Sequence, residues 1–224
     1  MKRTAKTLAI AAAGLALGLA ALGNWSAPAT HAQTPGLASA PIAPLTGAWA
    51  VDPAHTNVNF AIRHFGISTV RGRFDDIAGA ISADAAHPEN SSVQFTMQAA
   101  SVDTNVKMRD DDLRSANYFD VAKYPTLTFQ STKVRKGKRG SYVADGDLTI
   151  HGVTKAISLP FRVSGPIRDA FGGSRIGLET GIRLNRTDFG VGGTDKLANG
   201  AMDIGTDVDV TISLEAIPAK PATP

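Results

Sequence analysis

The chain has 224 residues, a length typical of one domain or of one domain with short appendages. Hydrophobic residues make up 43% of the sequence and charged residues 19%, which excludes a disordered, collagenous or coiled-coil chain. Cysteine is absent, so disulfides, thiolate metal sites, a cysteine nucleophile, thioether-linked haem and a lipid-modified N-terminal cysteine are all excluded.

The formal net charge of +3 has a local source. Lys2, Arg3 and Lys6 account for the whole excess, because residues 1–32 contain no acid. The rest of the chain carries no formal net charge. This balance removes the electrostatic argument for a nucleic acid partner.

The N-terminal segment has the order of a secretory signal peptide. A basic start is followed by an apolar run over residues 7–23, and Thr30-His31-Ala32 resembles a cleavage site before Gln33. A retained membrane anchor is the alternative. It is the weaker reading, because Gly and Thr interrupt the run and no basic flank follows it. We expect residues 1–32 to be cleaved and the protein to be secreted to the periplasm.

The composition divides the remaining chain into three parts. Residues 33–47 lack charge and are rich in Pro, Ala, Ser and Gly, which predicts a flexible linker. Residues 218–224 contain three prolines and predict a disordered tail. A single domain is expected over residues 48–217.

Apolar and polar residues alternate through this domain. The clearest run places Val93, Phe95, Met97 and Ala99 between polar residues, and the pattern recurs at 57–63, 126–130, 147–150, 157–163, 176–184 and 207–215. A period of two with one apolar face is typical of antiparallel strands, whereas buried parallel strands are apolar throughout. Turn signals separate the runs at 136–140, Gly152 and Gly172-Gly173, and we expect a strand with a bulge to pass through Asp145-Gly146.

One segment breaks the alternation. Residues 105–115 are good helix formers, and Thr104 or Asn105 could cap the helix start. The predicted fold is therefore all-β, with eight or nine antiparallel strands and one short helical insert. Eight such strands can close into a barrel whose interior fits side chains or one small apolar ligand.

The polar residues form no recognisable metal or catalytic motif. His55, His64, His87 and His151 lack ligand spacing, so structural roles are expected and no metal is predicted. No G-x-S-x-G elbow or triad-like order occurs, so no catalytic residue is assigned. An apolar barrel without a nucleophile favours binding over catalysis, and we expect a protein that is not an enzyme and needs no cofactor.

Asp110-Asp111-Asp112 lies between two arginines. Arg109 could pair with Asp112 and Arg114 with Asp110, which would make a solvated, self-paired helix face. Alternatively, Arg109 and Arg114 lie at the barrel mouth, where guanidinium groups could hold a polar or phosphate headgroup.

Six motifs occur in an order that resembles one known family. They are Val51-Asp52-Pro53-Ala54-His55-Thr56, Gly72-Arg73-Phe74, Leu113-Arg114-Ser115 with Tyr118-Phe119-Asp120, Tyr124-Pro125-Thr126, Gly146-Asp147-Leu148-Thr149-Ile150 with Gly152-Val153-Thr154, and Arg186 with Asp188-Phe189-Gly190. Over residues 49–215 the chain resembles the YceI-like lipid- and polyisoprenoid-binding family of secreted bacterial proteins. That family usually has His where Asp112 stands and an acid where Asn117 stands.

The resemblance implies a lipocalin-like antiparallel barrel around a long apolar ligand, such as a polyisoprenoid or fatty-acid derivative. Transient membrane contact is compatible with such a carrier, and the oligomeric state is open. The inward faces predict ligand-binding residues Phe60, Ile62, Phe95, Met97, Phe129, Ile150, Phe161 and Val210, with Arg109, Arg114, Arg186 and Asp188 at the mouth.

Two alternatives remain open from the sequence. One is a barrel enzyme that acts on an isoprenoid or lipid substrate through His55, His64 or Asp188; a His–carboxylate pair inside the cavity would favour it. The other is a barrel packed by its own side chains; a cavity too small for a chain would favour that.

Overall fold

The computed structural model describes residues 45–193, 195, 197, 200 and 202–220. The predicted signal peptide and most of the predicted linker lie outside the described residues. Within the described residues, no helix is long and apolar enough to span a membrane.

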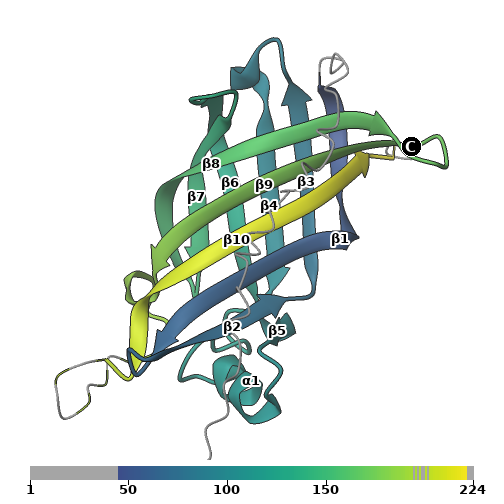
Figure 1. The fold of residues 1–224 in the computed structure, drawn as a ribbon. Helices are drawn as coiled ribbons and strands as arrows, with labels where there is room; N and C mark the ends of the chain where they lie inside the picture. Colours follow the sequence, from purple (N-terminus) through teal and green to yellow (C-terminus); the bar gives the residue numbers. More distant parts are fainter. Residues whose placement is uncertain (1–44, 194, 196, 198–199, 201, 221–224) are drawn as a thin grey trace, which may run out of the picture. The chain divides into compact units, whose positions relative to one another are not determined.

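Antiparallel strands form a closed eight-stranded barrel in residues 45–220, as predicted (Figure 1). The circuit runs β1-β3-β4-β6-β7-β8-β9-β10 and closes by pairing of β10 with β1. The strands are β1 Thr46–His64, β2 Ser68–Phe74, β3 Ile77–Asp84, β4 Ser92–Gln98, β5 Val102–Asp103, β6 Thr126–Lys136, β7 Tyr142–Ile150, β8 Val153–Arg168, β9 Ser174–Asn185 and β10 Ile204–Pro218. The helical elements are η1 Pro88–Asn90, η2 Ala99–Ser101, α1 Lys107–Arg114 and η3 Arg186–Phe189.

The longest strand, β1, has two partners on one side. Its first part, Thr46–Ala50, pairs with β3, and its last part, Val58–His64, pairs with β2. An irregularity between Asp52 and Asn57 separates the two parts and shifts the register with β10. Strand β2 therefore pairs with the last part of β1 without being one of the eight strands that close the barrel. The two-residue strand β5 pairs with β2.

The two ends of the barrel differ in packing. At the end where β1, β7 and β9 begin, buried side chains fill the interior; Val134, Ala144, Ile176 and Ala216 are each at most 2% exposed. We call this the packed end. At the opposite end, where those strands finish, α1 lies beneath β2 and β5 (Figure 1). We call this the helix end.

The predicted alternating runs fall in observed strands, but most of these strands are longer than the runs, and no run was predicted for β2 or β3. Strand β1 begins at Thr46, two residues before the predicted domain, and Pro218 of the predicted tail pairs with Trp49. Strand β7 passes through Gly146 as expected, while the bulge lies on its partner β6, between Ser131 and Lys133. The inward run on β4 ends earlier than predicted, because Ala99 is buried in η2 after the strand has ended.

The helix begins two residues later than expected and its start is held differently. Neither Thr104 nor Asn105 caps it; Val106 occupies the N-cap position without a side-chain hydrogen bond. The buried Asp110 carboxylate instead accepts hydrogen bonds from the Thr104 backbone N–H (2.8 Å) and hydroxyl (2.5 Å). Thus an acid within the helix anchors the chain that precedes it, and the predicted Asp110–Arg114 pair does not form.

Candidate functional site

The barrel encloses a cavity of about 980 Å³ that reaches from its middle to the helix end. Apolar side chains from β1, β2, β4 and β6 to β10 make most of its wall. The strands position these side chains by their alternation, because every second residue points inward. Small-molecule pockets commonly measure about 300–1,000 Å³, so this cavity is large for a ligand site.

All eight residues predicted to bind the ligand line this cavity: Phe60, Ile62, Phe95, Met97, Phe129, Ile150, Phe161 and Val210. Six of them remain half-exposed although they face the interior, while Phe95 and Phe129 are buried. A side chain with one face on a cavity keeps exposed area that a packed core would cover. Their contact with a ligand stays a prediction.

The sequence prediction missed other inward residues of the same strands. Leu148, Leu159 and Ile212 belong to the alternating runs and would have followed from a full application of that pattern. Lining residues outside the strands could not be predicted in this way. Alpha-helix α1 and the segment after it pack onto the barrel through tertiary contacts, and these have no local sequence pattern. The lining residues missed include Val58, Phe74, Leu127, Leu148, Ile157, Leu159, Ile182, Leu184, Val208, Ile212, Met108, Leu113, Tyr118 and Phe119.

Polar side chains join the lining near the helix end. Arg63, His64 and Ser68 come from the β1–β2 hairpin, and Arg109 and Asp112 come from α1. This end of the cavity can therefore hydrogen-bond a polar group, while the walls further in offer almost only hydrocarbon. An elongated ligand with one polar end fits this gradient.

Arg186 lines the cavity and is only 7% exposed. Its guanidinium donates to the backbone carbonyls of Gly205 (2.9 Å), Val191 (2.7 Å) and Ile204 (3.1 Å). No carboxylate lies within ion-pair distance in the described residues, which include every Asp and Glu of the chain. Two of its five N–H donors thus hold the start of β10 and a third holds Val191 in the segment after η3, and its charge lacks an anionic partner among the described residues.

The glycine-rich segment after η3 fits closely around this arginine. Gly192 has a positive φ of 71°, and a Cβ there would lie 2.8 Å from Arg186 Nη1 and 2.7 Å from the Tyr118 ring. Only glycine combines that backbone conformation with so close an approach. Burial, followed by the charge of Asp112, raises the pKa of Tyr118, so its phenol stays protonated at neutral pH.

The other predicted mouth residues have separate positions. Arg109 lines the cavity, and it donates to the Thr104 hydroxyl and carbonyl rather than to Asp112. Arg114 does not line the cavity; its guanidinium fastens α1 to the carbonyls of Ala100 and Val102. Asp188 is exposed on η3 and is also absent from the lining. Arg114 and Asp188 therefore do not lie at the cavity mouth as predicted: Arg114 is held by backbone carbonyls, and Asp188 is exposed outside the lining.

The two departures from the family pattern contact one another. The Asn117 side-chain amide donates a hydrogen bond to the Asp112 carboxylate at 3.1 Å. This hydrogen bond links α1 to the segment that follows it.

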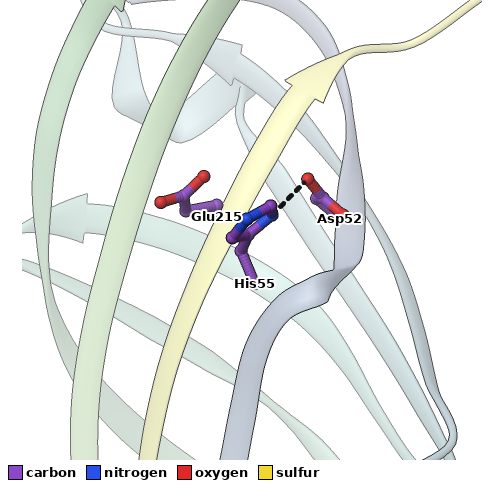
Figure 2. Close-up of side chains that lie close together, drawn as sticks. All are labelled: Asp52, His55 and Glu215. Carbon is purple, nitrogen blue, oxygen red and sulfur yellow. Dashed lines mark hydrogen bonds and ion pairs between the residues drawn. The ribbon is translucent and has the colours of Figure 1, made fainter. Parts of the chain in front are cut away.

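A second polar cluster lies at the packed end, outside the cavity lining (Figure 2). Asp52 and His55 of β1 lie beside Glu215 of β10, with His55 Nδ1 2.9 Å from Asp52 Oδ2. Arg175 Nη1 donates to Asp52 at 2.7 Å and to Glu215 at 3.0 Å, and its Nε donates to Asp169 at 3.0 Å. The Arg175 guanidinium, and then His55, lowers the pKa of Asp52 to about 2.

These donors could in principle hold a cation, since the ligand atoms of Asp52, His55 and Glu215 all lie within 4.8 Å of one another. A metal ion would have to compete with the Arg175 guanidinium, which already bridges both carboxylates. The cluster is therefore better described as an ion-pair network that joins β1, β9 and β10.

No His–carboxylate ion pair occurs among the described residues that line the cavity. His64 lines it, but within the described part of the chain no carboxylate lies within ion-pair distance of this imidazole. The closely paired histidine, His55, belongs to the cluster at the packed end. The geometry can accommodate an apolar molecule, and it presents no His–carboxylate pair to it.

Comparison with known proteins agrees with this architecture. The family model described as "YceI-like domain" matches residues 49–216. A UPF0312 protein of Azotobacter vinelandii is 40% identical over 166 residues, which cover 73% of this chain and 82% of that protein. A UPF0312 protein of Ectopseudomonas mendocina is 43% identical over 137 residues, or 61% and 72% of the two chains.

Solved structures show the same fold. The YCEI protein of Campylobacter jejuni is 30% identical with a TM-score of 0.60, and the match covers 71% of this chain and 91% of that one. BcnA of Burkholderia cenocepacia is 22% identical with a TM-score of 0.65, covering 74% and 98%. A polyisoprenoid-binding domain of Saccharophagus degradans is 17% identical with a TM-score of 0.57, covering 76% and 98%. With a matching family model over most of its length and relatives at 40% identity, the chain belongs to the YceI-like family.

Proposed function

We propose that the protein binds one long apolar molecule, a polyisoprenoid or a fatty-acid derivative, and carries or sequesters it inside the barrel. The observation that carries this proposal is the apolar cavity of about 980 Å³. A barrel packed by its own side chains would lack such a volume. The structural likeness to a polyisoprenoid-binding domain supports the same ligand class.

Transfer of hydrocarbon from water supplies the affinity. Each buried methylene contributes about 0.8 kcal/mol, and the ordering of a flexible chain offsets part of this gain. An apolar tube discriminates by length and width more than by chemical identity. Affinity should therefore rise with chain length until the cavity is full.

The polar residues at the helix end suit a ligand with one polar terminus. Arg109 keeps N–H donors beyond those bonded to Thr104, and Arg186 has a charge without an anionic partner in the described residues. We assign these two side chains to the headgroup.

The test is mass spectrometry of organic extracts from the purified protein. A long-chain lipid recovered in near-stoichiometric amount, and absent after equal treatment of an unrelated barrel protein from the same cells, is the expected result. A parent protein that carries no lipid and takes up none from a lipid mixture contradicts the carrier function.

The proposed location is the periplasm, after export and cleavage near Gln33. The order of basic, apolar and small residues in the N-terminal segment supports it. Intact-mass measurement of protein released by osmotic shock should give a chain that begins near Gln33. The full 23.3 kDa chain in a membrane pellet would instead indicate a retained anchor.

A further inference from the structure

Exposed hydrophobic side chains occur on two elements at the helix end of the barrel. Ile67 and Met108 are each 81% exposed, and Phe65 and Val106 are each 43% exposed. Phe65 and Ile67 form the tip between β1 and β2, while Val106 and Met108 begin α1. Both elements lie at the same end of the barrel (Figure 1). We call these four residues the rim patch.

The rim patch adjoins the cavity on both elements. His64 and Ser68, which flank the hairpin tip, line the cavity, and so does Met108 of the patch itself. A molecule that enters from this end passes beside exposed apolar side chains. Met108 thus joins the patch directly to the cavity lining, while Phe65 and Ile67 adjoin it through the polar residues His64 and Ser68.

The hairpin tip has an aromatic residue, Phe65, in a backbone conformation that destabilises bulky side chains. The two central residues of the turn, Phe65 and Gly66, both have positive φ, 50° and 71°. Turns of this kind favour Asn-Gly, and a bulky residue with positive φ is a strained outlier. The Phe65 ring lies against the His64 ring, with centroids 3.9 Å apart, and stays exposed on its other side. A polar residue such as Asn would be more soluble and less strained at this position. The exposed Phe65 ring is therefore evidence for a binding surface.

Positive charge accompanies the hairpin tip. From Ala61 to Arg73 the hairpin contains no acid, and it carries Arg63 and Arg71 close to the tip. All Asp and Glu residues of the chain are among the described residues. None of their carboxylates lies within ion-pair distance of Arg63 or Arg71. Arg63 bonds only the neutral Gly66 carbonyl and Thr69 hydroxyl. Apolar side chains flanked by free cations complement an anionic lipid surface.

We propose that the rim patch docks on the surface of an anionic lipid bilayer. Phe65 and Ile67 enter the headgroup layer, and Arg71 lies against lipid phosphates. The inference rests on the proposed function, since a long-chain ligand is stored in bilayers. A docked mouth lets that chain slide into the cavity without exposure to water.

The test is flotation of the protein, expressed with its own N-terminal segment, with phosphatidylcholine vesicles that contain or lack phosphatidylglycerol. The parent should float with the anionic vesicles, and less so at high salt. The double variant Phe65→Asn/Ile67→Ser should partition about tenfold more weakly or worse. Asn suits the positive φ at residue 65, so the melting temperature should not fall, and loss of binding cannot be attributed to unfolding.

Matched controls come from the packed end. Phe171 (95% exposed) and Ile167 (60% exposed) lie around the β8–β9 turn, and Phe171→Asn/Ile167→Ser should float like the parent. Arg71→Gln should reduce the preference for anionic vesicles, whereas Lys138→Gln, in the β6–β7 loop, should not. These variants share the N-terminal segment, so any binding by that segment cancels in the comparison.

Two forms of ligand supply separate this inference from the proposed function. Phe65 and Ile67 do not line the cavity, so their variant should take up cyclodextrin-dispersed lipid like the parent and take up vesicle lipid more slowly. Docking is overturned if the parent does not float, or if the double variant floats equally well, whatever the cavity binds. If the parent floats and the variant does not, but no lipid enters from either source, docking stands and the carrier function fails.

Discussion

At the scale of single residues, Gly146 shows how tightly the barrel wall is built. A Cβ at this position would contact the Gln130 carbonyl and approach the Ser131 Cα to 2.7 Å, and both are backbone atoms of the bulged partner strand. Backbone cannot move aside as a flexible side chain can. We expect Gly146→Ala to lower the free energy of unfolding by about 1–3 kcal/mol in chemical denaturation.

Gly177 provides the matched control for that substitution. It lies in β9, and a Cβ there would meet its nearest atoms at 3.8–3.9 Å, an ordinary contact distance. Gly177→Ala should therefore leave stability unchanged or raise it slightly, because alanine restricts the unfolded chain. Equal losses in both variants would contradict the proposed steric cause.

The ion-pair network at the packed end predicts a pH dependence of stability. Arg175 lowers the pKa of Asp52 in the folded protein to about 2, from 3.8. A carboxyl group with a lowered pKa stabilises the fold above its unfolded value, and that contribution is lost as the pH falls through 3.8 toward 2. Near the surface it is worth about 1 kcal/mol. Asp52→Asn should remove it, so the variant's deficit in denaturation midpoint at pH 6 should shrink at pH 2.5.

An acid without an ion pair supplies the comparison for Asp52. Asp76 is exposed and has no salt bridge in the described part of the chain. Asp76→Asn should leave the pH profile of the parent unchanged. A constant deficit for Asp52→Asn at all pH values would show that packing, and not charge, explains the effect.

The sequence predicted residue types better than residue partners. The inward residues followed from the alternation of apolar and polar residues, whereas helical spacing offered an Asp110–Arg114 pair as one of two interpretations. In the structure both bind chain segments before the helix, through Ala100, Val102 and Thr104. Such partners depend on how the segment before the helix folds back onto it. Residue spacing along a single helix carries no information about that fold.

At the scale of elements, the alternation of each strand predicts that neighbouring positions respond differently to the same substitution. Val210 of β10 lines the cavity between Phe60 and Ile182 on the adjacent strands, and the next residue, Thr211, is exposed. Val210→Trp should fill part of the cavity and weaken lipid uptake. Uptake and thermal stability should be measured together, because a packed interior would show a loss of stability instead.

Thr211→Trp adds the same side chain to the outer face of the same strand. It should leave lipid uptake as in the parent, and any general effect of tryptophan on β10 will appear in both variants. Equal loss of uptake at the two positions would mean that the register of this strand is misassigned, because a slip by one residue exchanges the two faces.

Strands were easier to predict than the segments between them. A period of two is a local property of the sequence; it placed β4 to within one residue and marked the middle or start of β6, β8 and β10, but it gave no run for β2 or β3. The start of α1 was misplaced, because its first turn is fixed by the contact of Asp110 with Thr104 and not by a capping side chain. The end of the run on β4 was misplaced as well, since the pattern cannot distinguish a strand residue from the buried Ala99 of a following 3₁₀ turn.

At the scale of the whole molecule, closure of the barrel was predictable and the cavity was not. Eight alternating antiparallel strands can close into a barrel, and the resemblance to the YceI-like family favoured that arrangement. Whether side chains fill the interior depends on small differences in volume and direction, and the sequence left both outcomes open. The structure has a packed end and a cavity of about 980 Å³ that reaches the helix end, so we expect a ligand to enter from the helix end.

The stability of the whole barrel should therefore depend on its ligand. A molecule that binds only the folded state adds about 2.7 kcal/mol at a free concentration one hundred times its dissociation constant. For a domain of this size, that corresponds to a rise in melting temperature of about 5–10 °C. Thermal denaturation should be compared before and after removal of lipid by organic extraction, and again after lipid is added back.

The shift in melting temperature should be smaller for Val210→Trp. It should also change little with salt, because an apolar chain in a domain without net charge offers little charge to screen. Equal melting temperatures with and without lipid would show that the cavity is not a binding site.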